Sequence, residues 1–214
     1  MRLVAADHGE APARPVTIPP FETTVRPVSG RILDFDVETV AAGFADPDWV
    51  PQKITCVAWA WVGESRYAES RICTPAGLYS RPELRRGMLR VLLGQIEEAD
   101  MLTGHNIARF DLPVINAEAV RLGLEPIRRA VVQDTMRLVR SKGLKKGQDN
   151  LGRMLKTEGE KLALDWQAWQ DAYEEPGWRT IRNRAESDVE MHMEMRQTLL
   201  DRNVLRPPFT WTAQ

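Results

Sequence analysis

Hydrophobic and acidic residues alternate from Leu33 to Glu38, and this alternation predicts a β-strand over 30–38. Large apolar side chains occupy the odd positions and carboxylates the even ones: Leu33, Asp34, Phe35, Asp36, Val37 and Glu38. Successive side chains of a strand point to opposite faces of the sheet. We therefore expect the three carboxylates to project together from one face of an otherwise apolar element.

Apolar runs predict further strands at 54–62, 67–74, 101–103 and 131–135. The segment 67–74 is expected to pair antiparallel with 54–62 through the turn at 63–65.

Apolar residues that recur every three or four positions predict helices at 81–99, 112–122 and 178–201, and a further helix inside 137–156. The residues expected to face the core are Leu84, Met88, Val91, Leu92 and Ile96 in the first helix, Leu112, Ile115, Ala119 and Leu122 in the second, and Leu151, Met154 and Leu155 in the helix inside 137–156. The predicted strands come first along the chain and are followed by helices that alternate with short strands. This order predicts an α/β fold with a mixed sheet flanked by helices.

The chain is expected to form a single domain over 29–205. The segment 1–28 contains five prolines and no periodic pattern, so it is interpreted as an extended N-terminal arm. The segment 206–214 is interpreted as a C-terminal tail. A length of 214 residues with 43% hydrophobic residues is enough for one sizeable core.

Composition excludes few functions. The chain has no apolar run of the roughly 18 residues that a membrane span needs. Its first ten residues lack the apolar centre of a secretion signal, so we expect a cytoplasmic protein without membrane contact. Cys56 and Cys73 fall in predicted strands without metal-ligand spacing and are expected to be buried reduced thiols. The net charge of −1 argues against coating long nucleic acid, although a local basic stripe can still bind a strand.

The three clustered carboxylates have two open interpretations. They repel one another, and burying an unpaired charge is costly, so they would be tolerated at a solvent-facing edge. Alternatively, a divalent cation offsets the cost, because carboxylate oxygens suit Mg²⁺ or Mn²⁺. Matching acids elsewhere in the chain favour the second interpretation.

Two later acids match. Asp111 precedes Leu-Pro at a predicted helix start, where it is a good N-cap, and this role is compatible with metal binding. Asp188 lies inside the last predicted helix, where Ile181, Ala185, Asp188 and His192 are spaced four, three and four. This spacing places Asp188 on the stripe that faces the core. A carboxylate in that position needs a partner.

Three segments carry a resemblance to a known family. They resemble the three motifs of the DEDD superfamily of DnaQ-like 3′–5′ exonucleases. The segments are Phe35-Asp36-Val37-Glu38-Thr39, the run 105–113 with its His-Asn and Phe-Asp-Leu-Pro, and Ser187-Asp188-Val189. The resemblance extends from about residue 30 to 200, which is nearly the whole chain apart from the N-terminal arm.

The resemblance implies a ribonuclease H-like fold and a catalytic site of four acids. Asp36, Glu38, Asp111 and Asp188 would hold two Mg²⁺ or Mn²⁺ ions, with Asp36 as the bridging ligand. Asp34 has no counterpart in the motif and is expected either to support the ligands from behind or to face solvent. The implied reaction is phosphodiester hydrolysis, in which one ion activates water and the other stabilises the leaving oxygen.

The resemblance also implies a substrate. Thr39 and Asn106 would hold the terminal nucleotide, and His105 and Phe110 would contact a base. The expected partners are single-stranded DNA or RNA 3′ ends, from which nucleoside 5′-monophosphates are released, and a polymerase or another replication or repair protein.

The chain departs from the family at the residue that handles the attacking water. The family has His five positions, or Tyr four positions, before the last Asp, and this chain has Asn183 and Arg184 there. Asn183 can orient a water but cannot accept its proton, and Arg184 shares the face of Asp188 and can clamp a phosphate. Three outcomes are open: Asn183 orients the water, a displaced base such as His192 acts instead, or the protein is a catalytically weak or inactive binding module. We favour the first because all four acids are present, and interpret His192 as a polar residue at the edge of the core.

Two further features bear on nucleic acid. A basic stripe either tracks a phosphate backbone or is a solvated surface: Arg137, Arg140, Lys142, Lys145, Lys146 and Arg153. Trp59 and Trp61 share a strand face and are expected in the core. Trp49, in a loop beside two prolines, is the better candidate for stacking on a base.

Overall fold

The computed structural model describes residues 30–41, 52–73, 81–140, 143, 145–157 and 178–213. The predicted N-terminal arm 1–28, the stacking candidate Trp49 and Lys142 of the basic stripe lie outside these residues.

Within the described residues, six strands form one mixed sheet in the order β3-β2-β1-β4-β5-β6. The strands are β1 (Ile32–Ala41), β2 (Gln52–Trp61), β3 (Glu69–Ile72), β4 (Met101–Gly104), β5 (Arg129–Asp134) and β6 (Phe209–Thr212). The central strand β1 pairs antiparallel with β2 and parallel with β4. The outer pairs β2–β3 and β5–β6 are antiparallel, and β4–β5 is parallel. The sequence-based prediction of a mixed α/β sheet is confirmed.

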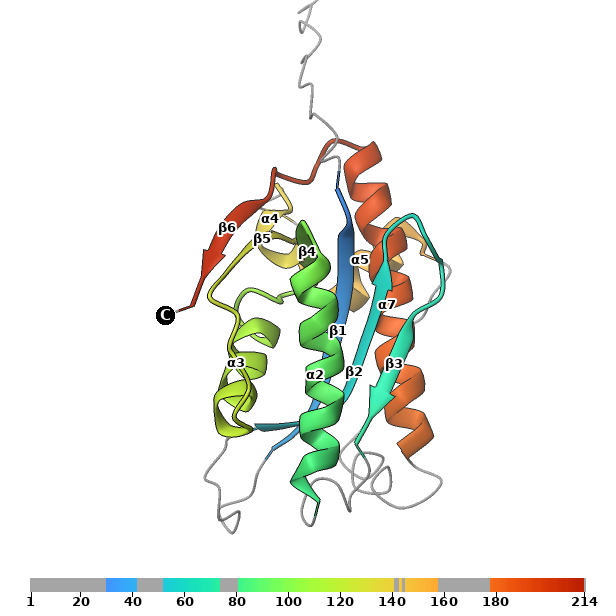
Figure 1. Ribbon diagram of the computed structural model, residues 1–214. Coiled ribbons are helices and arrows are strands. Elements are labelled where there is room, and N and C mark those ends of the chain that lie inside the picture. The colour runs from blue at the N-terminus through green and yellow to red at the C-terminus, as the bar shows by residue number, and fades with distance from the viewer. Residues whose placement is uncertain are drawn as a thin grey trace, which may run out of the picture.

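Helices cover both faces of this sheet. They are α2 (Pro82–Glu98), α3 (Asp111–Arg121), α4 (Thr135–Leu138), α5 (Gln148–Leu155) and α7 (Trp178–Asp201). Figure 1 shows α2 and α3 on one side of the central strands and the long α7 on the other. None of the helices among the described residues is long and apolar enough to cross a membrane.

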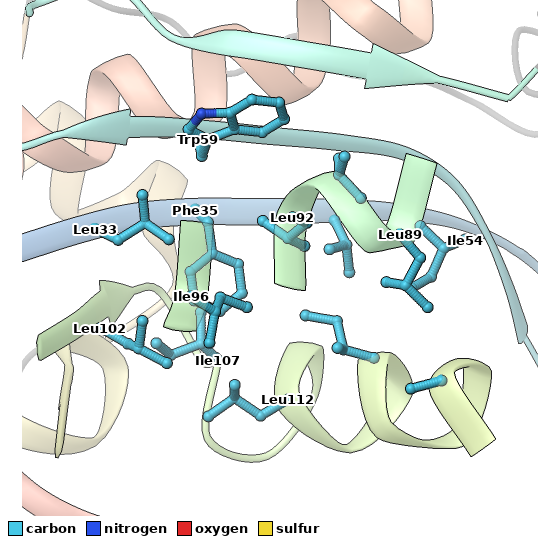
Figure 2. Packing of buried hydrophobic residues seen from close by; sticks show 14 of the residues in the cluster. Leu33, Phe35, Ile54, Trp59, Leu89, Leu92, Ile96, Leu102, Ile107 and Leu112 are labelled. Carbon is cyan, nitrogen blue, oxygen red and sulfur yellow. The ribbon is translucent and has the colours of Figure 1, made fainter. Parts of the chain in front are cut away.

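The alternation along β1 divides its side chains between the two faces as predicted. Leu33, Phe35 and Val37 are buried in the core formed with α2 and α3. Figure 2 shows Leu33 and Phe35 among the buried side chains of that core, with Leu92 of α2 and Leu112 of α3 close by. The intervening carboxylates therefore lie on the α7 face.

The α7 face of β2 is built from small residues. Cys56, Ala58 and Ala60 pack against Ile181 and Ala185 of α7 in a second apolar cluster, which also contains Val189. Short side chains on a strand allow the backbone of a helix to come close, so α7 is held against the sheet near β1. Cys56 and Cys73 are buried free cysteines, as expected, and burial raises the pKa of the Cys73 thiol to about 11.

Three details of the sequence-based interpretation are wrong. In α2, Leu84 and Val91 are 40% and 37% exposed, because the buried face contains Arg85 and Leu89 instead. Met154 is 43% exposed on α5. The strand at 129–134 is not the last one, because part of the predicted tail forms β6 and its Trp211 is buried against the core.

Candidate functional site

The candidate site lies where β1 faces α7. Asp36 and Glu38 project from β1, and the pairing register with β2 shifts between Glu38 and Thr39, which indicates a β-bulge at the end of the acidic motif. Asp188 projects from the stripe of α7 that contains Ile181 and Ala185, and all three are buried, as the helical spacing predicted.

Three carboxylates converge at this point. One oxygen from each of Asp36, Glu38 and Asp188 lies within 4.8 Å of the others. Glu38 and Asp188 are buried, whereas Asp36 is partly exposed. The cluster therefore stands at the boundary between the core and solvent.

The donor set suits a hard divalent cation. Two oxygens on opposite sides of a Mg²⁺ ion are about 4.2 Å apart, twice the usual Mg–O distance. The oxygens of Asp36, Glu38 and Asp188 lie within 4.8 Å of one another, a limit slightly above this largest separation around one ion. Their oxygens are the ligands that Mg²⁺ and Mn²⁺ prefer. The residues present thus fit the metal that the sequence motifs imply.

A guanidinium group is part of the same cluster. Nε of Arg184 donates to Oε1 of Glu38 at 2.7 Å, and its Nη2 lies 3.9 Å from Oδ2 of Asp188. The Arg184 side chain is only 15% exposed. The sequence-based interpretation considered solvent or a metal ion as what makes the repulsion among these acids tolerable. In the structure, Arg184 already reduces that repulsion.

Asp111 lies next to this cluster but faces the backbone of β1. It is the first residue of α3, and its Oδ1 accepts a hydrogen bond from the backbone N–H of Val37 at 3.1 Å. The N-cap position belongs to Phe110, so the interpretation of Asp111 as the N-cap is wrong. The pKa of Asp111 is raised to about 7. Burial is the largest cause, backbone hydrogen bonds oppose it, and the nearby carboxylates of Asp134 and Glu38 add to it.

The proposed water-handling residue, Asn183, is exposed on α7. The helix begins at Trp178, so Asn183 and Asp188 belong to one continuous helix. Five residues of an α-helix turn through about 500°, which places Asn183 roughly 140° from Asp188 around the helix axis.

The turn between β4 and α3 contains three residues expected to bind substrate. His105, Asn106 and Phe110 are all partly exposed. Asn106 has a positive φ of 71°. Gly104 makes this turn possible, because a Cβ there would meet the side chain of Ile107 and would lie 2.8 Å from the carbonyl oxygen of Phe35. Thr39, the fourth expected substrate residue, is partly exposed just beyond the bulge.

A buried carboxylate holds this turn in place, and the sequence analysis missed it. Asp134 accepts hydrogen bonds from the backbone N–H groups of Asn106, Ala108 and Arg137 at 3.0–3.2 Å. Asp134 is also the N-cap of α4. An Asp at the end of a buried strand, followed by a helix, is the sequence signal that would have indicated this role.

A second polar cluster lies further along the same strand and helix. Oδ2 of Asp34 is 2.6 Å from Nδ1 of His192, whose Nε2 is 2.9 Å from the hydroxyl of Thr135. The same hydroxyl is 2.9 Å from Nδ1 of His105. Asp34 is fully buried, so of the two alternatives given for it, the one in which it faces solvent is wrong. Burial raises its pKa, and the contact with His192 opposes this shift.

Exposed basic residues lie on the elements that follow β5. Among the described members of the basic stripe, Arg137, Arg140, Lys145 and Arg153 are exposed and Lys146 is partly exposed. Arg153 forms an ion pair with Asp149, and the Arg137 guanidinium stacks 4.0 Å from the ring centre of Phe209.

Comparison with known proteins establishes the fold only. No protein-family model and no curated protein matches the sequence. Among solved structures, the family B DNA polymerase from the hyperthermophilic archaeon Pyrobaculum calidifontis is similar, with a TM-score of 0.62 and 16% sequence identity over 80% of this chain. The match covers 24% of the polymerase, so this chain corresponds to about a quarter of that protein. The chain therefore has a fold that also occurs within a DNA polymerase.

Proposed function

We propose that this protein is a metal-dependent 3′–5′ exonuclease with a ribonuclease H-like fold. It would hydrolyse phosphodiester bonds at single-stranded DNA or RNA 3′ ends and release nucleoside 5′-monophosphates. The observation that carries the proposal is the convergence of Asp36, Glu38 and Asp188 from β1 and α7. These are acids of the motifs that resemble the DEDD exonucleases, and similarity of fold to a DNA polymerase supports the same interpretation.

The acids would bind the metal, and other residues would position the substrate. Asp36, Glu38 and Asp188 would hold Mg²⁺ or Mn²⁺, with Asp111 beside them once it is deprotonated. Two divalent ions at such carboxylates supply activation of the attacking water and stabilisation of charge on the leaving oxygen. The turn anchored by Asp134 would orient the terminal nucleotide.

The substrate would reach the site along a surface of basic side chains. Asn106, His105 and Phe110 lie on the anchored turn, whose exposed parts are available to a nucleotide. The exposed basic residues that follow β5 would contact the backbone phosphates of the strand, an interaction that weakens with salt. Asn183 stays the sequence-based candidate for orienting the water.

A second candidate function is favoured by one observation. Arg184 contacts two of the expected metal ligands, Glu38 and Asp188, in place of the Tyr that the resemblance leads us to expect. A weakly active or inactive chain with this feature would serve as a module that binds nucleic acid or a polymerase.

The test is hydrolysis of 5′-end-labelled single-stranded DNA and RNA by chelator-treated protein, with Mg²⁺, Mn²⁺ or chelator added. We expect metal-dependent shortening from the 3′ end. Asp36→Asn should lower the rate more than about 100-fold, because even residues that only support metal ligands cost 10- to 100-fold when mutated. The control is Asp149→Asn, which removes a surface carboxylate of α5 that pairs with Arg153.

The outcomes separate the two candidates. Activity that survives unchanged in Asp36→Asn would rule out the proposed site. Absence of hydrolysis in every condition, together with a Mn²⁺-dependent rise in the melting temperature of the unmutated protein, would favour the binding module.

A further inference from the structure

We propose that Arg184 is a resident counter-cation that competes with divalent metal for Glu38 and Asp188. The metal-free site is then held together by the guanidinium, and metal binds by displacing it from Glu38. This inference rests on the metal site of the proposed function and adds to it a control of metal affinity. It does not depend on which nucleic acid, if any, is hydrolysed.

The contacts of Arg184 support competition. The contact from its Nε to Oε1 of Glu38 at 2.7 Å has the length of a charge-assisted hydrogen bond. One oxygen of the Glu38 carboxylate belongs to the cluster that a metal would use, and 3.9 Å separates Nη2 of Arg184 from Oδ2 of Asp188. A metal ion and the guanidinium therefore seek the same carboxylates.

The charges of the cluster also favour competition between Arg184 and a metal ion. The three carboxylates of the cluster carry up to three negative charges, and Arg184 offsets one of them. A divalent ion at the same carboxylates would be repelled by this positive charge. A second ion would also lie close to the Arg184 guanidinium, and repulsion between the two positive groups is strong in a partly buried site. Loading of two ions thus requires Arg184 to leave Glu38.

The fold places Arg184 at this position by helix geometry. Residues four apart on a helix are neighbours on one face, so Arg184 lies one turn before Asp188. The Arg184 side chain is 15% exposed, close to solvent, and it can swing outward without unfolding α7. Its long stem allows the guanidinium to release Glu38 while the helix stays in place.

The experiment measures Mn²⁺ binding without nucleic acid, by isothermal titration calorimetry on chelator-treated protein. We expect Arg184→Gln to bind Mn²⁺ at least about tenfold more tightly than the unmutated protein, because a competing positive charge is removed. Arg184→Lys should fall between the two, since an ammonium keeps the charge without the fork geometry of a guanidinium.

A matched control removes the same charge from the same helix. Arg182 lies two residues earlier, is 48% exposed at its side chain and pairs with Glu186 at 2.9 Å. Arg182→Gln should change the Mn²⁺ affinity less than about threefold, because exposed charges are screened by solvent and salt.

A second readout covers the case in which Arg184→Gln is poorly folded. Without metal, its melting temperature should be lower than that of the unmutated protein, because Glu38 and Asp188 lose a partner. Saturating Mn²⁺ should raise the melting temperature of Arg184→Gln more than that of the unmutated protein. If Arg184→Gln does not fold without metal, the test of the proposal rests on Arg184→Lys. The proposal then requires Arg184→Lys to bind Mn²⁺ more tightly than the unmutated protein.

Several results would overturn the inference. Equal or weaker Mn²⁺ binding by Arg184→Gln would mean that Arg184 positions Glu38 for the metal instead of competing with it. Absence of Mn²⁺ binding in all variants would also overturn it. Tighter binding by Arg184→Gln without any hydrolysis would support the counter-cation and refute only the exonuclease.

Discussion

Two polar groups that involve the same strand, β1, and the same helix, α7, are organised differently. Asp34 meets His192, and this pair continues through Thr135 to His105. One turn of α7 away, Asp36, Glu38 and Asp188 share Arg184.

In the first group Asp34 contacts His192, both almost completely buried, and the buried charge of Arg196 also attracts Asp34. The second has three acids and one guanidinium, with Asp36 partly exposed. A single buried acid in contact with a buried base is balanced within the protein, whereas several clustered acids at the edge of the core can gain from an external cation. The difference supports the second group as the proposed metal site, whereas the first is part of the buried interior.

The largest expected effect comes from breaking the balanced pair. His192→Ala leaves Asp34 buried without its partner and should lower the free energy of unfolding by about 3–5 kcal/mol. The measurement is urea unfolding in chelator at pH 7. The melting-temperature rise that Mn²⁺ produces should persist in the folded fraction, because the metal site is separate. The double variant Asp34→Asn, His192→Gln should recover part of the loss. No recovery would mean that Asp34 is not the group left unsatisfied.

An intermediate effect on the free energy of unfolding is expected from pH, through Asp111 beside the cluster of Asp36, Glu38 and Asp188. Burial raises the pKa of Asp111 from 3.8 to about 7, so the native state holds a proton that the unfolded chain releases. Stability due to this group is therefore fully present below about pH 4 and is lost as pH rises to about 7.

The measurement is urea unfolding without metal from pH 4 to pH 8, compared with Asp111→Asn, which cannot titrate. The unmutated protein should lose stability relative to Asp111→Asn across this window. Adding Mn²⁺ should favour the ionised carboxylate and oppose the loss at the upper end. A constant difference between the two proteins would contradict the raised pKa.

The smallest effect is expected from Asn183, which the sequence suggested as the residue that orients the attacking water. Because Asn183 is exposed and about 140° from Asp188 on α7, Asn183→Ala should change the hydrolysis rate less than about threefold. The rate is measured under saturating Mn²⁺ on the better of the two nucleic acids. A loss of tenfold or more with unchanged stability would support the sequence-based role instead.

Local patterns were enough to predict the elements that carry the site. The alternation along β1 and the spacing of Ile181, Ala185 and Asp188 on α7 each predicted the buried face correctly. These patterns succeed because side-chain direction is set by the backbone of the element itself.

The same reasoning failed in α2 for a physical reason. Its buried face contains Arg85, which forms an ion pair with Glu118 of α3 at 3.1 Å. A pattern that places only apolar residues inside cannot anticipate a charge whose partner belongs to another helix. The result is that Leu84 and Val91, both apolar, face outward.

The sequence by itself determined which acids share a face of β1 and which stripe of α7 meets the core. The partners of those acids were decided only by the tertiary structure. Arg184 lies 146 residues from Glu38, and His192 lies 158 residues from Asp34. Such pairs depend on how far a helix slides along a strand when the two pack together. That position is set by the small residues of β2 and by the core as a whole, and neither local pattern contains it.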